Sequence, residues 1–297
     1  MQKMGLYSLA VCSMLFAVSA KADETVYVMS AGSDGVQQFN INIAAGTETL
    51  VRHIGQGGPN GLTAGGNGRG VVVVGDTMYY TYANSANVYS YNLATSTDNG
   101  VLFTVAGASG LATASWDGSH LLLGDYSGTD KVYTYTLGGA LVSTVDLSKC
   151  AEVHQDSTKG FCDGLTFRSD GKLVSNEGDG GFGGPSQYDV YDITGGTPVQ
   201  TGLITTNYGA TGIAFDNTNY IVSDIFHDQL GIYDASGTFV KFIALADGDH
   251  TNAIEEVSVN FNQVLNPTPE PAMYPVLAAF VVGLVALRRK LSKGLAG

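Results

Sequence analysis

The sequence predicts an all-β fold: a five-bladed β-propeller of four-stranded antiparallel blades, closed by a C-terminal strand and flanked by two terminal hydrophobic helices. Three observations predict the propeller. One apolar–polar–aromatic pattern recurs five times along the chain. No useful stretch between Asp23 and Leu265 has the 3.6-residue periodicity of a helix. The chain also has 40 glycines and 16 tyrosines but few charged residues, which is typical of β-sheet with many turns.

The recurring pattern centres on one aromatic residue in each copy. Its alternation with period two identifies a strand that has one buried face. Four antiparallel strands repeated about every 48 residues are the signature of a β-propeller. The marker aromatics, at intervals of 52, 44, 56 and 42 residues, are Phe39, Tyr91, Tyr135, Tyr191 and Tyr233.

The other strands of each blade surround the marker strand in a fixed order. A first strand begins with glycine, a second strand ends in a polar residue, and a fourth strand follows the marker strand. Turn pairs such as Asp117-Gly118 and Asp170-Gly171 separate the strands. The clearest first strands are 110–113, 164–167 and 212–215; the clearest second strands are 122–125, 173–176 and 221–224; fourth strands include 140–147 and 238–245.

The ends of the repeat array indicate how the ring closes. The first blade begins directly with its second strand at Thr25, whereas Ala253–Val259 resembles a first strand that has no blade of its own. We therefore expect this strand to complete blade one, within a propeller domain at 23–265. Six blades remain the alternative if the long stretch from Gly55 to Thr77 contains extra strands.

The N-terminus has the pattern of a secretory signal peptide at 1–22. A short basic region precedes an apolar run from Leu6 to Ala20, and Ala20-Lys21-Ala22 matches an A-x-A cleavage site. The prediction is therefore an exported protein. Cys150 and Cys162 lie close together in one loop and, in an oxidising compartment, are candidates for a disulfide; two unpaired thiols are the alternative.

The C-terminus contains a second apolar segment with a different arrangement. A linker and short motif at 266–271 precede the apolar run Ala272–Leu287, which has 16 residues where a comfortable membrane span needs about 20. The basic residues that follow would be held on the cytoplasmic side. We expect 272–297 to form a hydrophobic helix with a basic tail that contacts the membrane at least transiently. The motif and basic residues are Pro269, Glu270, Pro271, Arg288, Arg289 and Lys290.

This arrangement resembles the PEP-CTERM sorting signal of Gram-negative bacteria, over about the last 30 residues. The resemblance implies processing near Pro269–Pro271 by an exosortase-type membrane enzyme. It also implies a location at the cell surface or in the extracellular matrix, in the company of exopolysaccharide and biofilm. Thr268, where valine is common, and the tail Leu291–Gly297 depart from the pattern.

The charge of the exported part excludes one class of partner. Of 14 Lys and Arg residues, two lie in 1–22 and four in the C-terminal tail, which leaves 8 against 27 acidic residues. A surface this acidic repels nucleic acid, so we expect no nucleic-acid partner.

Polar residues at the ends of second strands and before first strands meet at one end of a propeller axis. Their oxygen atoms suit Ca²⁺ or another divalent cation, although Asp and Asn at such positions commonly only cap turns. Trp116 is expected to pack between blades. Of the five histidines, only His227 is expected near the axis. The candidate metal ligands are Asp125, Asp163, Asn176, Glu177 and Asp224, with Asn60, Ser109 and Asn252 at comparable positions.

The strand ends Gly-Leu-x-Phe and Val-Ser-Asp are similar to those of NHL-type and gluconolactonase-like propellers. The second family implies a divalent ion that polarises a lactone. The similarity concerns the repeat pattern and transfers no catalytic residue to this chain. We therefore expect an exported binding or scaffold propeller with no catalytic residues, whose partners are extracellular polysaccharide or surface proteins. A metal-dependent hydrolase, lactonase or lyase is the alternative.

Overall fold

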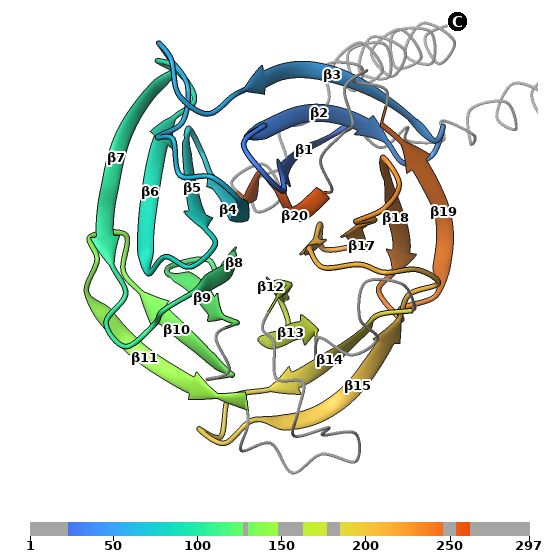
Figure 1. Ribbon diagram of the computed structural model, residues 1–297. Coiled ribbons are helices and arrows are strands. Elements are labelled where there is room, and N and C mark those ends of the chain that lie inside the picture. Colours follow the sequence, from blue (N-terminus) through green and yellow to red (C-terminus); the bar gives the residue numbers. More distant parts are fainter. Residues whose placement is uncertain (1–22, 127–129, 148–162, 177–184, 246–253, 262–297) are drawn as a thin grey trace, which may run out of the picture.

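The computed structural model describes residues 23–126, 130–147, 163–176, 185–245 and 254–261, and the structural statements that follow concern these residues. Twenty strands form five four-stranded antiparallel sheets arranged as blades around a central axis (Figure 1). The predicted five-bladed propeller is therefore confirmed. No helix of the described residues is long and apolar enough to cross a membrane. The segments at 1–22 and 266–297, as well as Cys150 and Cys162, lie outside these residues.

In blades 2 to 5 the chain runs from the innermost strand to the outermost, whereas in blade 1 the innermost strand is the last strand of the array. Blade 1 consists of β20 (Ile254–Val259), β1 (Glu24–Ser30), β2 (Val36–Asn42) and β3 (Thr47–Ile54). Blade 2 consists of β4 (Gly68–Val74), β5 (Thr77–Tyr82), β6 (Asn87–Asn92) and β7 (Thr97–Thr104). Blade 3 consists of β8 (Leu111–Trp116), β9 (Leu121–Asp125), β10 (Lys131–Tyr135) and β11 (Leu141–Asp146). Blade 4 consists of β12 (Leu165–Phe167), β13 (Lys172–Asn176), β14 (Gln187–Asp192) and β15 (Val199–Thr205). Blade 5 consists of β16 (Ile213–Phe215), β17 (Asn219–Ser223), β18 (Gln229–Asp234) and β19 (Phe239–Ala244).

The ring closes through β20, as the sequence predicts. This strand pairs antiparallel with β1, from Val26 opposite Val259 to Ser30 opposite Ile254. The six-bladed alternative is wrong. The stretch from Gly55 to Thr77 contains the inner strand β4 and, before it, a loop whose strand-like feature is a single bridge between Gln56 and Leu62.

The marker aromatics have a common structural role. In every blade the pairing between the third and fourth strands shifts register beside the marker, and each marker side chain is at most 3% exposed. A β-bulge adds twist and bends the outer strand, which makes its free edge a poorer template for pairing with another chain. The repeat in the sequence is therefore a repeat of a buried ring beside a bulge.

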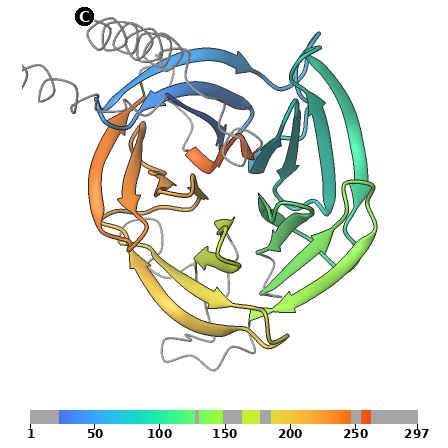
Figure 2. The ribbon, with the colours of Figure 1, turned by 180° about the vertical axis from the view of Figure 1, so that it is seen from behind.

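The innermost strands of the five blades surround the axis, as the view from behind also shows (Figure 2). A β-carbon on Gly164 would lie 1.7 Å from the carbonyl oxygen of Thr211 in the next blade. A β-carbon on Gly212 would lie 2.5 Å from the Cα atom of Glu256. The glycines that begin the first strands are therefore required where neighbouring blades approach each other most closely.

Candidate functional site

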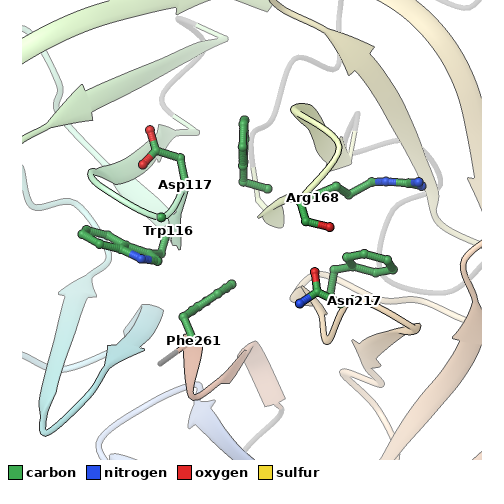
Figure 3. Close-up of a pocket in the computed structure, with 9 residues that line it drawn as sticks. Trp116, Asp117, Arg168, Asn217 and Phe261 are labelled. Atoms are coloured by element: carbon green, nitrogen blue, oxygen red, sulfur yellow. The ribbon is translucent and has the colours of Figure 1, made fainter. Parts of the chain in front are cut away.

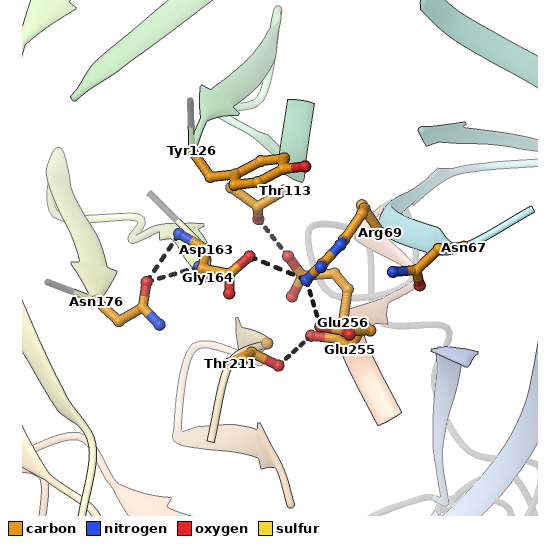
Figure 4. A network of polar contacts seen from close by, with 12 residues as sticks. Asn67, Arg69, Thr113, Tyr126, Asp163, Gly164, Asn176, Thr211, Glu255 and Glu256 are labelled. Atoms are coloured by element: carbon orange, nitrogen blue, oxygen red, sulfur yellow. Dashed lines mark hydrogen bonds and ion pairs between the residues drawn. The ribbon is translucent and has the colours of Figure 1, made fainter. Parts of the chain in front are cut away.

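One end of the axis carries a cluster of polar side chains from all five blades. We call it the polar end and define it by Arg69, Thr113, Asp163, Thr211, Glu255 and Glu256. First strands begin and second strands end here, so the sheet topology places inner-strand residues of different blades opposite one another (Figure 4).

Arg69, near the start of β4, connects blade 2 with two other blades. Its Nη1 atom lies 2.8 Å from Oε2 of Glu255 in blade 1 and 3.5 Å from Oδ1 of Asp163, directly before blade 4. The guanidinium also lies 5.3 Å from the ring centroid of Tyr126, at cation–π distance. Its Nε atom is buried and has no hydrogen-bond partner among the described residues, so one donor of the fork remains unused.

The side chain of Glu256 forms hydrogen bonds with two other blades. Its Oε1 atom accepts hydrogen bonds from the backbone N–H groups of Ile213, at 3.1 Å, and Val257, at 3.0 Å, and its Oε2 atom is hydrogen-bonded to the hydroxyl of Thr113. The side chain thereby links blade 1 to blades 3 and 5 and is fully buried. The hydroxyl of Thr211 donates to the carbonyl of Glu255 at 2.6 Å, which adds a second link to blade 5.

Burial raises the pKa of all three carboxyl groups at the polar end. The pKa of Glu255 rises to about 7 because the side chain is desolvated, although Arg69 acts in the opposite direction. Burial also raises the pKa of Asp163, against the charge of Arg69, and it raises the pKa of Glu256 well above its usual range. Glu255 can therefore exchange a proton near neutral pH.

The arrangement offers a small polar surface at the mouth of the axis. The side chains of Arg69, Asp163 and Glu255 are 14%, 15% and 7% exposed. Together they present a cationic donor, carboxylate acceptors and the Tyr126 ring to a ligand outside. Chemically, the site can form hydrogen bonds with polar groups and exchange a proton near pH 7.

The structure brings together two of the five predicted cation ligands. Oδ1 of Asn176 accepts hydrogen bonds from the backbone N–H groups of Asp163 and Gly164, both at 2.9 Å, and so positions the Asp163 backbone. Asp125 is buried and accepts from the N–H of Gly110 at 3.3 Å. Glu177 lies outside the described residues.

Asp224 organises its own loop in blade 5. It is buried and accepts from the N–H groups of Phe226 and His227, and from the side chain of Gln229 at 2.7 Å. The imidazole of His227 is 69% exposed and contacts the same carboxylate through Nδ1 at 3.0 Å. These contacts match the alternative that the predicted ligands cap turns.

No three His, Cys, Asp or Glu side chains lie close enough to hold a metal ion within the part of the chain that the structure describes. Because Glu177 and the Cys150–Cys162 loop are not in that part, the divalent-cation site stays a prediction. Asn60, grouped with the axial residues from its place in the sequence, instead lies in the loop before β4, where its carbonyl accepts from the hydroxyl of Tyr91 at 2.8 Å.

Arg69 and the roles of Glu255 and Glu256 were not predicted from the sequence. One signal was present: all three are charged residues within inner strands whose other residues are mostly apolar or small, Gly68–Val74 and Ile254–Val259. Charged groups are rarely buried unless they are paired, so their presence in such strands indicates partners across the ring.

The opposite end of the axis is aromatic. Trp116, Phe167, Phe215 and Phe261, at or just beyond the ends of inner strands, surround a pocket of about 40 Å³ (Figure 3). Trp116 is buried in the main core cluster, so its predicted packing role is confirmed. Arg168 covers the ring of Phe215 at 5.2 Å and pairs with Asp170 at 2.9 Å. A pocket of this volume accommodates little more than water.

No protein-family model matches the chain, and no curated protein matches it. Among solved structures, the chain is similar to one in the crystal structure of a nidogen/laminin complex, with a TM-score of 0.49 and 10% identity, covering 79% of this chain and 98% of that chain. It is also similar to glutaminyl cyclase of Myxococcus xanthus, with a TM-score of 0.44 and 12% identity, covering 69% of this chain and 76% of that one. At these values the comparison concerns the fold alone.

Proposed function

We propose that the chain is an exported propeller that acts as a binding or scaffold protein at the cell surface or in the extracellular matrix. The observation that carries the proposal is the polar end, where Arg69, Asp163 and Glu255 from three blades form a small, partly exposed recognition surface. Polar groups of a ligand would bind to this surface from outside the ring.

Binding fits this geometry better than catalysis does. The charged groups contact one another, and the close approach of Gly164 to Thr211 and of Gly212 to Glu256 leaves no room for a substrate to enter between the inner strands. A catalytic pocket usually buries most of its ligand, whereas this mouth offers contacts on one side only.

The proposed destination rests on the sequence. The signal peptide pattern at 1–22 and the PEP-CTERM resemblance at 266–297 imply export, processing by an exosortase-type enzyme and association with exopolysaccharide or surface proteins. The ring offers support, because its closing strand β20 ends at Val259. A processing enzyme could therefore cut near Pro269 without removing a strand of the described propeller.

The binding proposal is tested with the exopolysaccharide of the producing bacterium. Purified chain should sediment with the polysaccharide, and Arg69→Lys and Tyr126→Ala should reduce the bound fraction, because both change the exposed part of the polar end. Ser169→Ala is the matched control, since Ser169 is exposed at the aromatic end of the axis. Binding that is equal in all four proteins, or absent in all, contradicts a role for the polar end.

A second function is an exported metal-dependent hydrolase, lactonase or lyase. Its support is that two of the predicted cation ligands, Asp163 and Asn176, meet beside the polar end, while a third, Glu177, follows Asn176 directly in the sequence. Ca²⁺ or Mg²⁺ bound there would raise the melting temperature, and EDTA would reverse the effect. A melting temperature unchanged by Ca²⁺, Mg²⁺ and EDTA rejects this alternative.

A further inference from the structure

A second hollow lies away from the axis, against blade 2. Residues 55–67, between β3 and β4, form a long loop that meets the turn between β6 and β7. Between them is an open hollow of about 400 Å³, within the size range of small-molecule sites. Its walls are Gly57, Gly58, Asn60, Gly61, Leu62, Thr63, Ala64, Ser96, Thr97 and Asp98.

The loop is held in place by many hydrogen bonds. Leu62 is buried in the core cluster between blades 1 and 2. The side chain of Gln56 donates to the carbonyls of Gly32 and Gly66 and accepts from the backbone N–H groups of Gly65 and Gly66. The hollow is thus formed before any ligand arrives, which lowers the entropic cost of binding.

Asp98 is the polar centre of the hollow. Its Oδ1 atom accepts from the hydroxyl of Tyr80 at 2.7 Å, and its Oδ2 atom accepts from the hydroxyl of Thr63. Tyr80 also accepts from the N–H of Thr63 at 3.1 Å, so that strand and loop orient the carboxylate together. No ion pair to Asp98 occurs among the described residues, and each carboxylate oxygen can accept another hydrogen bond.

The turn beside Asp98 differs in sequence from the corresponding turns of the other blades. Between the third and fourth strands, four blades have a glycine with positive φ, namely Gly46, Gly139, Gly196 and Gly237. Blade 2 has Ser96 there, with φ of 52°, a conformation that costs a non-glycine residue about 1 kcal/mol. Ser96 is also part of the wall of the hollow, where its hydroxyl adds a polar group that glycine would lack.

We propose that this hollow binds a neutral saccharide unit, with Asp98 accepting hydrogen bonds from sugar hydroxyls. The walls combine small glycine residues, which let a ring approach the backbone, with hydroxyl and amide groups from Ser96, Thr97 and Asn60. Sugar hydroxyls both donate and accept hydrogen bonds, so they can pair with both the donors and the acceptors among these groups. Phosphate and carboxylate ligands are disfavoured because Asp98 is the charged side chain of the wall.

The choice of a saccharide as ligand rests on the proposed binding function, but the binding site is the hollow in blade 2 and not the polar end. Its failure and that of the broader proposal are therefore distinguishable. Sedimentation with exopolysaccharide that depends on Arg69 would continue without a sugar site in blade 2, and a sugar site could exist in a protein that does not associate with the matrix.

The test is saturation-transfer NMR on the full-length chain in a zwitterionic detergent, with D-glucose, D-galactose, D-mannose and N-acetyl-D-glucosamine as probes. We expect saturable transfer to at least one sugar, with binding at least tenfold weaker in Asp98→Asn and in Ala64→Trp. Ala64 is an exposed wall residue, so tryptophan there fills the hollow. Ala94→Trp is the control, because Ala94 is exposed near the same turn but outside the wall, and it should bind like the original chain.

Two sets of results would overturn the inference. One is absence of transfer to all four sugars, or equal binding by the Ala64→Trp and Ala94→Trp variants. The other is displacement of the sugar by methylammonium chloride at equal concentration, which would assign Asp98 to a cationic ligand. Circular dichroism spectra show which variants are folded, and the tryptophan pair decides the outcome if Asp98→Asn does not fold.

Discussion

Ionisation of Glu255 should make the stability of the propeller fall as the pH rises through neutrality. The carboxyl group is buried, and its pKa is raised from 4.5 in the unfolded chain to about 7 in the folded chain. The folded state therefore binds this proton more tightly than the unfolded state. The contribution to stability is complete below pH 4.5 and is lost as the pH rises through about 7.

The expected size of the effect follows from the shift in pKa. Each pKa unit corresponds to about 1.4 kcal/mol, so a rise from 4.5 to about 7 corresponds to about 3 kcal/mol in the free energy of unfolding. Asp163 and Glu256 shift in the same direction and add their own dependence on pH. The contribution of Glu255 is therefore measured as a difference between the original chain and the variant Glu255→Gln.

Urea unfolding between pH 4 and pH 8 measures this difference, with the fluorescence of Trp116 as the signal, because it is the one tryptophan of the chain and is buried. From pH 4 to pH 8, the free energy of unfolding of the original chain should fall by about 3 kcal/mol more than that of Glu255→Gln. The control Asp76→Asn changes an exposed carboxylate in the turn between β4 and β5 and should behave like the original chain. If Glu255→Gln has the same dependence on pH as the original chain, the reasoning is wrong.

Three further predictions concern the packing and charge of the ring. Gly212→Ala should lower the free energy of unfolding by about 2 kcal/mol or more, because its β-carbon would meet the backbone of Glu256, whereas Gly195→Ala, which has open space, should have little effect in urea unfolding. Arg69→Met should lower the free energy of unfolding by about 3 kcal/mol at pH 8, because Glu255 and Asp163 would be left without their cation, and by less at pH 5. An equal loss at both pH values would argue against the ion pairs. Ser96→Gly should stabilise the chain by about 1 kcal/mol through relief of its positive φ, and a lower melting temperature would contradict this.

The repeat pattern predicted the fold because its signals are local. A buried aromatic such as Tyr135 or Tyr233 alternates with polar neighbours over a few residues, and turn pairs such as Asp117-Gly118 follow the strands at fixed offsets. The closing strand could also be predicted, because an inner-strand pattern was left over where the first blade lacked one.

The candidate site could be predicted only in part because its contacts are not local. Arg69 and Glu255 are 186 positions apart in the chain, and they meet only because the ring brings blade 2 beside blade 1. Asp163 was found because it precedes a first strand, but the identity of its cationic partner depends on side chains that cross the axis. The hollow in blade 2 could not be predicted for another reason. Its glycine-rich loop has no periodicity, and the loop and Asp98 are positioned by hydrogen bonds with tyrosine hydroxyls on β5 and β6.

The proposed role depends most directly on where the protein goes and on which residues it keeps. The decisive measurement is the intact mass of the chain recovered from the extracellular fraction of the producing bacterium, compared with the chain in its membrane and cytoplasmic fractions. We predict an extracellular chain that begins at Asp23 and ends near Pro269, with the propeller intact. A chain that extends to Gly297 in the extracellular fraction, or a chain that keeps Met1 in the cytoplasm, would contradict the proposal.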